Sequence, residues 1–312
     1  MKFYFDKNDG NKLSNTCVTI GTFDGLHLGH QNILNVLKNI AKEKELNTTV
    51  VSFDPHPRRI VKKSFDIKIL TTIDEKREFL EELGIDNFYI INFTEDFSKQ
   101  TSEEFVKNYI VDRFDAKYLV VGHDHKFGKD RGGDTESLQK LGSELGFGIT
   151  SVDAVENQGE IISSTKIRDA LLNGDVEKAN NYLGRSYSLQ GEVVKGASRG
   201  RVLGFPTANL QLGNQNKLIP QNGVYAVGCS LNDDQLYGVM NIGYRPTFND
   251  TKELVPEVHI FKFNRNIYGD TLKINFIKRI RPEKKFDSKD ELITQIELDK
   301  QKAAEIMEVE IN

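Results

Sequence analysis

Apolar positions in the first 180 residues follow two alternating spacings. Between the strand-like segments, apolar residues recur every three or four positions, as over 33–41, which is typical of one helix face. Strands that alternate with helices predict a parallel sheet with helices on both faces. Four short apolar runs have the length and branched residues of buried strands: 16–20, 48–53, 87–93 and 117–121.

Capping residues mark the ends of the predicted helices. Thr72 with Glu75, and Thr101 with Glu104, have the spacing of a capping box, in which side chains and backbone N–H groups bond reciprocally. Gly84 is suited to ending the first of these helices, because glycine adopts the left-handed conformation found there.

After residue 186 the spacing changes to short strands separated by turn residues. A series of short strands separated by turns predicts an antiparallel sheet or small barrel. Residues 288–307 have the periodicity of a helix, which would be the last element of the chain. The strand candidates are 188–194, 224–230, 235–242, 257–263 and 271–277. We therefore expect an α/β plus β chain. A doubly wound parallel-sheet (Rossmann-like) domain would occupy 1–184, and a small antiparallel β-barrel domain with a C-terminal helix would occupy 185–312.

Composition narrows the kinds of partner. The 42 basic and 46 acidic residues are interleaved and give a net charge of −4, so we expect no nucleic-acid polymer as partner. Cys17 and Cys229 stand far apart in apolar runs, which favours buried, inert thiols. No uncharged apolar run is long enough to span a bilayer, and 1–11 lack the apolar core of a secretory signal. We expect a cytoplasmic protein without a membrane partner.

Residues 21–30, GTFDGLHLGH, are the first candidate site. His27 and His30 lie where a strand gives way to a helix, and the free N–H groups and dipole of a helix start favour an anion. Gly29 leaves room for close backbone approach by a phosphate. The alternative is a capped helix with two partly exposed histidines.

Other polar segments follow later strands or open a helix. His27, Asp54 and His123 each follow a predicted strand, and ligands of such sheets bind where the strands end, so we expect them to converge. The segment 162–168, ISSTKIR, places hydroxyls and a cation at a helix start. Two alternatives stay open: 54–57 is only a rigid turn, or 123–125 is a metal site.

The segment 191–209 is a glycine- and arginine-rich loop that leads into a strand. Its free N–H groups suit phosphates, although it lacks the GKS/T ending of a P-loop. Thr207 and Asn209 could face a magnesium ion or bond within a turn. Glu257 and His259 share one strand face, where Glu257 could act as a base or simply face solvent.

Taken in order, these segments resemble a known bacterial family, the bifunctional riboflavin kinase/FAD synthetase. GTFDGLHLGH, FDPHP and SSTKIR resemble its nucleotidyltransferase (FMN adenylyltransferase) module. The run GEVVKGASRGRVLGFPTANL, then NGVY, NIGYRPTF and EVH, resembles its riboflavin kinase domain. The resemblance implies phosphorylation of riboflavin to FMN, then adenylylation of FMN to FAD with release of pyrophosphate. ATP would be the co-substrate of both reactions and Mg²⁺ the metal.

The resemblance also assigns roles to residues of this sequence. Glu257 would be the general base of the kinase, while His27 and His30 would be the catalytic residues of adenylyl transfer. In the adenylyltransferase, ATP would contact Gly21, Phe23, His27, His30, Ser164, Thr165 and Arg168, and the flavin would contact Asp54, His56, Asp124 and His125. In the kinase, ATP would contact Gly196, Arg201, Gly204, Thr207 and Asn209, with Thr207 and Asn209 also holding Mg²⁺.

One position departs from the family pattern. His125 stands where the family usually carries an aromatic residue. It motivates one alternative to the bifunctional enzyme, a chain whose adenylyltransferase is impaired. A separate alternative, from another class of protein, is a flavin-binding regulator without turnover. The sequence also leaves the oligomeric state open between a monomer and a chain that transiently self-associates.

Overall fold

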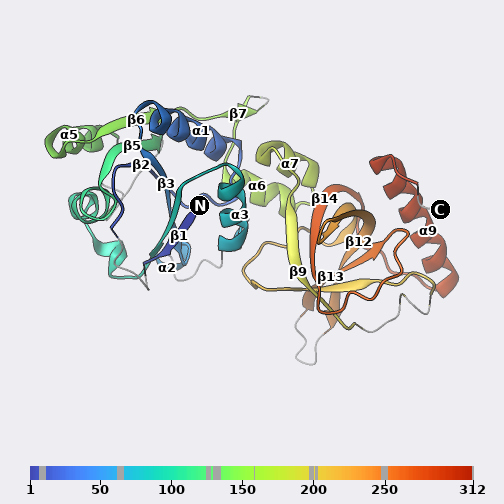
Figure 1. The fold of residues 1–312 in the computed structure, drawn as a ribbon. Coiled ribbons are helices and arrows are strands. Elements are labelled where there is room, and N and C mark those ends of the chain that lie inside the picture. Colours follow the sequence, from blue (N-terminus) through green and yellow to red (C-terminus); the bar gives the residue numbers. More distant parts are fainter. Residues whose placement is uncertain are drawn as a thin grey trace. The chain divides into compact units, whose positions relative to one another are not determined.

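The computed structural model describes residues 1–6, 12–61, 67–123, 128, 135–157, 159–196, 200, 203–246 and 252–310. Its contacts divide the chain into two compact units, Met1–Ser164 and Thr165–Asn312 (Figure 1). Helices α6 and α7 precede the second unit's barrel, and most of α6 is grouped with that unit. The functional boundary at 184/185 stays a prediction.

The first unit is built on a six-stranded sheet in which every pairing is parallel (Figure 1). The strand order is β1-β4-β3-β2-β5-β6, so β2 lies between two strands that follow it in the chain. Its elements are β1 (Lys2–Phe5), β2 (Thr16–Ile20), α1 (Leu28–Glu43), β3 (Asn47–Asp54), α2 (Pro57–Val61), α3 (Ile73–Glu82), β4 (Asn87–Asn92), η1 (Phe97–Lys99), α4 (Ser102–Phe105), η2 (Val106–Val111), β5 (Ala116–Gly122), α5 (Thr135–Leu145), β6 (Gly148–Val152) and the two-stranded β7 (Glu156–Asn157) and β8 (Glu160–Ile161).

Apolar side chains cover both faces of this sheet. Alternate residues of β2 and β4 enter different cores: Val18 and Tyr89 pack with α4, η2 and α5, while Cys17 and Phe88 pack with α1 and α3. This alternation follows from the two-residue repeat of a strand. It confirms the predicted doubly wound architecture.

Local signals in the sequence agree with the structure. Both predicted capping boxes are formed, at Thr72 with Glu75 and at Thr101 with Glu104. Gly84 has a φ of 73° just beyond α3, as a helix-ending glycine should. The edge strands β1 and β6 were absent from the predicted elements.

The second unit is a closed antiparallel barrel with the strand order β10-β13-β12-β11-β14-β9 (Figure 1). Closure leaves the barrel without an unpaired edge. Ser164, the first residue of α6 (Ser164–Leu172), belongs to the first unit. The second unit consists of the rest of α6, α7 (Val176–Leu183), β9 (Ser188–Val194), β10 (Ala208–Leu212), β11 (Gly223–Leu231), β12 (Asp234–Pro246), β13 (Lys252–Ile260), β14 (Thr271–Arg281) and α9 (Lys289–Met307).

The barrel confirms the predicted fold and corrects the bounds of three strands. Strands β12 and β14 continue to Pro246 and Arg281, beyond the predicted ends at 242 and 277. The sequence predicts a strand over 257–263, but β13 starts five residues earlier, at Lys252, and ends at Ile260. Its early part pairs with the end of β12, with Lys252 opposite Pro246, and this long hairpin brings residues 252–256 into the barrel. Helix α9 begins directly after Ser288, whose side chain caps it.

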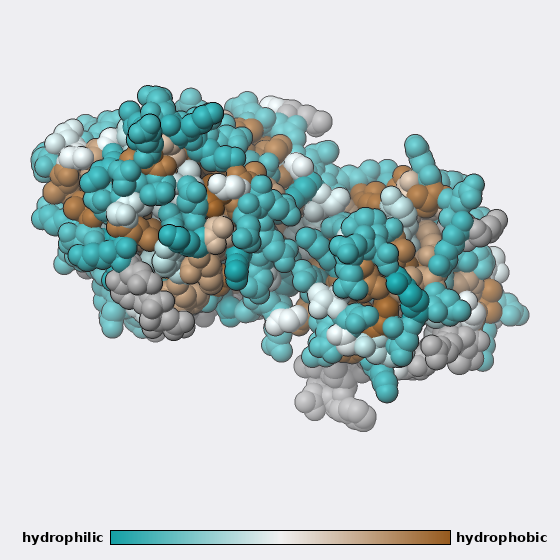
Figure 2. Space-filling view, viewed as in Figure 1, coloured by the Kyte–Doolittle hydropathy of each residue, from teal (hydrophilic) through white to brown (hydrophobic). Residues whose placement is uncertain are grey.

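The visible face of both units is mostly hydrophilic, with apolar residues in small patches (Figure 2). In the described part of the chain, no helix combines the length and apolarity needed to cross a bilayer. Cys17 and Cys229 are buried as predicted, and burial raises the pKa of each thiol to about 12. Both thiols therefore stay protonated and unreactive at neutral pH.

Candidate functional sites

The strand order of the first unit brings three candidate segments to one edge of the sheet. Strands β3, β2 and β5 are neighbours and parallel, so Asp54, the loop 21–27 and His123 all lie where these strands end. The order of strands reverses at β2, between β3 and β5. A reversal of this kind is where open α/β sheets bind their ligands.

The loop 21–27 is held in an unusual backbone conformation. Phe23 and Leu26 both have a φ of 45° and Gly25 has a φ of 91°. The left-handed region costs a residue with a side chain about 1–2 kcal/mol. Phe23 and Leu26 are buried in the core, which offsets this cost. Strain that is fixed by its surroundings is typical of ligand-binding loops.

Asp24 fastens the loop to a neighbouring segment. Its buried carboxylate accepts hydrogen bonds from the backbone N–H groups of Leu70 (2.8 Å) and Thr71 (3.0 Å). The hydroxyl of Thr71 in turn accepts a hydrogen bond of 2.9 Å from the N–H of Gly25. The carboxylate is thus used to hold the loop.

His27 and His30 form a pair at the start of α1. His27 is the N-cap residue, and its Nδ1 accepts a long hydrogen bond of 3.4 Å from the backbone N–H of His30. The two imidazole rings stack with their centroids 3.6 Å apart, and Phe23 packs edge-on against His30. No acidic residue occupies the first turn of α1, so nothing there opposes a bound anion.

This arrangement defines the protonation of the pair. Because Nδ1 of His27 accepts a hydrogen bond, its ring proton sits on Nε2. Burial, together with the neighbouring His27 and Lys76, moves the pKa of His30 well below its ordinary value, so His30 is neutral at pH 7. Nδ1 of His30 is buried and has no hydrogen-bond partner among the described residues.

Gly21 and Gly29 lie close to aromatic rings. A Cβ atom at Gly29 would lie 3.2 Å from the His27 imidazole, and one at Gly21 would lie 3.3 Å from the Phe23 ring. A side chain at either position would therefore require a small shift of the ring. The close approach of a phosphate to the backbone at Gly29 stays a prediction.

Ser164 connects the predicted phosphate segment to this loop. Its hydroxyl, at the first residue of α6, donates a hydrogen bond of 2.8 Å to the carbonyl of Asp24. Thr165 is exposed and Arg168 is buried, and both belong to the second compact unit. Their phosphate contacts stay predictions.

The predicted flavin-binding residues are only partly described. Asp54 ends β3 and is half-buried. Nδ1 of His56 accepts a hydrogen bond of 3.2 Å from the N–H of Arg58, a local contact of the kind expected for a turn. His123 is exposed. Asp124 and His125 lie outside the described residues.

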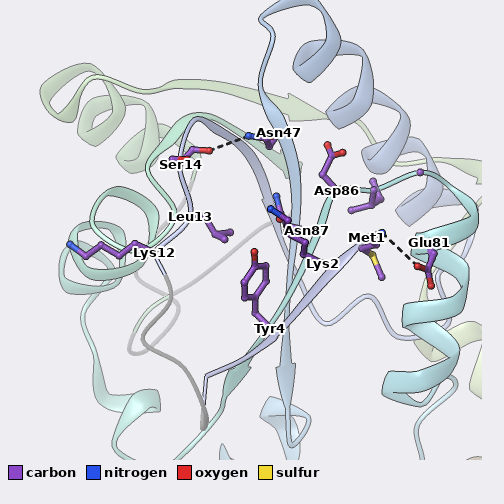
Figure 3. A pocket seen from close by; sticks show the side chains of 12 residues that line it. Met1, Lys2, Tyr4, Lys12, Leu13, Ser14, Asn47, Glu81, Asp86 and Asn87 are labelled. Atoms are coloured by element: carbon purple, nitrogen blue, oxygen red, sulfur yellow. Dashed lines mark hydrogen bonds and ion pairs between the residues drawn. The ribbon is translucent and has the colours of Figure 1, made fainter.

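A separate hollow of about 610 Å³ lies at the opposite edge of this sheet (Figure 3). Residues at the amino ends of β1, β3 and β4 line it, among them Lys2, Asn47 and Asn87. An ion pair of 3.5 Å joins the N-terminal amine of Met1 to Glu81 at its margin. The hollow contains none of the site residues predicted from the sequence.

In the second unit, the pairing of β10 with β13 brings the predicted kinase residues together. Asn209 lies directly opposite Glu257, and the hydroxyl of Thr207 donates a long hydrogen bond of 3.5 Å to Oε2 of Glu257. Asn209 is buried, whereas Glu257 is half-buried. Three oxygen-bearing side chains from segments 50 residues apart therefore meet on one face.

The glycine-rich loop is partly described. A Cβ atom at Gly196 would lie only 2.2 Å from Nδ2 of Asn209, so this glycine makes room for the Asn209 amide. Gly204 is exposed, with a φ of 87° that requires glycine or strain. Arg199 and Arg201 lie outside the described residues.

His259 makes a contact that the sequence does not predict. Nδ1 of His259 lies 2.9 Å from the carbonyl oxygen of Pro206, the residue before Thr207. Burial lowers the pKa of His259, so the ring is neutral and its Nδ1–H donates this bond. The rings of Phe205 and Phe261 pack edge-on against it. His259 thus ties the strand of Glu257 to the segment of Thr207.

Two substitutions at His259 test this link. The amide nitrogen of asparagine sits near the position of Nδ1, so His259→Asn is expected to retain at least a third of the turnover of the barrel's reaction. In His259→Gln the amide is one bond too far out, and we expect a loss of about tenfold, the cost of one hydrogen bond of about 1.4 kcal/mol. Equal activities of the two variants, measured by steady-state kinetics, would contradict the link.

Two protein-family models match the chain. FAD synthetase matches residues 9–166, and riboflavin kinase matches residues 183–307. The two matches follow one another along the chain and together cover most of it.

Relatives match nearly the whole chain. The chain is 40% identical over 288 residues to the bifunctional riboflavin kinase/FMN adenylyltransferase of Listeria monocytogenes, covering 92% of this chain and 91% of the relative. It is also 40% identical over 290 residues to the Bacillus subtilis protein of that name, covering 92% and 90%. A solved structure from Streptococcus pneumoniae, described as a macrolide-efflux protein, is 33% identical with a TM-score of 0.89, covering 96% and 97%.

Proposed function

Because this chain belongs to the family of bifunctional riboflavin kinase/FMN adenylyltransferases, we propose that its two activities occupy two separate sites. The barrel phosphorylates riboflavin to FMN, and the parallel-sheet unit adenylylates FMN to FAD, with ATP as co-substrate of both. The observation that carries this division is the meeting of Asn209, Thr207 and Glu257 across β10 and β13, separate from the histidine pair at the start of α1.

In the kinase, Glu257 acts as the general base. Its carboxylate takes the proton of the riboflavin 5′ hydroxyl while that oxygen forms a bond to the γ-phosphorus of ATP. The bond between the γ-phosphorus and the β–γ bridging oxygen breaks, and ADP leaves. The hydrogen bond from Thr207 fixes the orientation of the carboxylate.

The residues beside Glu257 suit Mg²⁺. Magnesium prefers oxygen ligands, and the Thr207 hydroxyl and the Asn209 amide oxygen are such ligands, gathered beside a carboxylate. Thr207 and Asn209 would hold the ion, and the ion would neutralise charge on the ATP phosphates.

In the adenylyltransferase, the reacting groups are both phosphates. An FMN phosphate oxygen forms a bond to the α-phosphorus of ATP, the bond to the α–β bridging oxygen breaks, and pyrophosphate leaves. The FMN phosphate is already ionised, so the step requires no general base. The chain's contribution is to position the phosphates and stabilise their charge, through the N–H groups at the start of α1 and the Nε2–H of His27. Ser164 supports the loop through its hydrogen bond to the Asp24 carbonyl.

The experiment that tests this function supplies the purified chain with ATP and Mg²⁺ and follows flavin products by chromatography. Riboflavin is expected to give FMN and then FAD, and FMN supplied alone is expected to give FAD. Formation of FMN without FAD in both arms would indicate the impaired adenylyltransferase. Saturable flavin binding without ATP consumption would indicate a binding protein and refute the proposal.

A further inference from the structure

Lys76 is a buried cation directly behind the histidine-bearing loop. It lies on α3, one turn before Leu80, and its side chain faces the core with only 6% of the residue exposed. Burying an ammonium group is unfavourable unless hydrogen bonds or opposite charges offset the loss of its hydration. Its presence on an otherwise apolar helix face therefore calls for a function.

The ammonium joins the loop to the neighbouring strand. Nζ donates a hydrogen bond of 2.7 Å to the carbonyl oxygen of Thr22 and one of 3.3 Å to Oγ of Ser52, on β3. The hydroxyl of Ser52 also donates to the Thr22 carbonyl, at 3.1 Å. Thr22 is the second residue of the loop, so the cation fixes the loop where it leaves β2.

Carboxylates act on the ammonium group without being its hydrogen-bond partners. Both hydrogen-bond partners of the ammonium are neutral oxygens. Burial lowers the pKa of Lys76 more strongly than the carboxylates of Asp24, Asp54 and Glu75 raise it. The same charge acts on His30, whose pKa it helps to lower. Lys76 therefore influences the histidine-bearing loop electrostatically as well as through its hydrogen bonds.

We propose that Lys76 is a positioning residue for adenylyl transfer: it holds the Thr22 carbonyl, and with it the loop 21–30, and its ammonium group supports the reacting phosphates from behind the loop. This inference rests on the proposed function of the first unit. Lys76 acts through the loop and through its field, without contacting the substrate. A preorganised charge of this kind stabilises the negative charge that develops in the transition state.

Two neutral variants test the proposal. Lys76→Met removes the charge and the donor, and Lys76→Gln keeps a donor without the charge. For either one we expect kcat of FAD formation from FMN and ATP to fall about 100-fold, while KM for FMN changes less than threefold. The melting temperature is expected to stay unchanged or rise, because loss of a buried charge need not destabilise a fold. Lys76→Arg, which keeps the charge, is expected to retain at least a tenth of wild-type turnover.

Two controls separate a local effect from damage to the fold. Lys38 on α1 donates a hydrogen bond of 2.6 Å to the carbonyl of Leu83, so Lys38→Met removes a comparable lysine contact elsewhere in the unit. We expect Lys38→Met to keep FAD formation within twofold of wild type. Riboflavin phosphorylation by the same chain should be unchanged in every variant.

The possible outcomes are distinct. If the wild-type chain forms no FAD, the proposed function of the first unit fails. If wild type forms FAD and a folded neutral variant stays within threefold of it, the inference about Lys76 fails. Failure of both neutral variants to fold, or equal losses in Lys38→Met, would assign Lys76 a structural role and would also overturn the inference.

Discussion

Glu257→Gln is expected to abolish FMN formation from riboflavin, with kcat reduced about 1,000-fold. Glutamine has the shape of glutamate and still accepts the hydrogen bond from Thr207, which joins the two residues at 3.5 Å. It cannot take the proton of the attacking hydroxyl. The variant should therefore lack the general base while keeping the structure of the site. The measurement is a single-turnover assay of FMN production with saturating ATP and Mg²⁺.

The same variant carries its own control. FAD formation from supplied FMN should remain within twofold of wild type, because that reaction requires no base from the barrel. Glu192→Gln makes the same chemical change on β9, where the side chain is exposed, and should leave both reactions unchanged. Substantial FMN production by Glu257→Gln would show that another group takes the proton.

The double variant His27→Ala, His30→Ala is expected to reduce FAD formation from FMN by about 1,000-fold or more, with FMN formation from riboflavin unchanged. Loss of one preorganised donor to a transition-state oxyanion typically costs a factor of 100–1,000. The double variant removes the Nε2–H of His27 and the stacked ring of His30 together. Chromatography of the products, with FMN and riboflavin supplied in separate reactions, measures both effects.

A further variant separates capping of α1 from phosphate contact. Asparagine is a favourable N-cap residue, so His27→Asn should preserve the start of α1 and the melting temperature, whereas alanine loses about 1 kcal/mol there. His27→Asn lacks the outer ring nitrogen and should still lose most FAD formation. If His27→Asn were fully active, His27 would serve only as a helix cap.

Much of the architecture follows from local patterns in the sequence. The strand β2 and its two-residue alternation, the capping boxes at Thr72 and Thr101, and Ser288 at the start of α9 are local features, and the structure confirms them. The edge strand β1 is different, because it is short and half-exposed and gains its place only by pairing with β4. The information that makes these residues a strand therefore lies in the pairing with β4, and not in the residues of β1 themselves.

Some residues of the candidate sites could be predicted from the sequence and others could not. His27, His30, Thr207 and Glu257 belong to recognisable segments, and the neighbouring strands bring them to their edges. Lys76 was not predicted, although one signal was available: a lysine that shares the apolar face of a helix with Leu80. Its hydrogen bonds to Thr22 and Ser52 depend on tertiary structure.

The central position of β2 also determines when this part of the chain can assemble during synthesis. Thr16 pairs with Asn47 on one side, but on the other side it pairs with Ala116, which the ribosome adds 100 residues later. A nascent chain that has emerged only to α3 therefore has β2 exposed along one edge. The edge that carries the candidate adenylyltransferase site can close only after β5 has emerged, so we expect stalled shorter chains to bind no ATP there and to depend on chaperones for solubility.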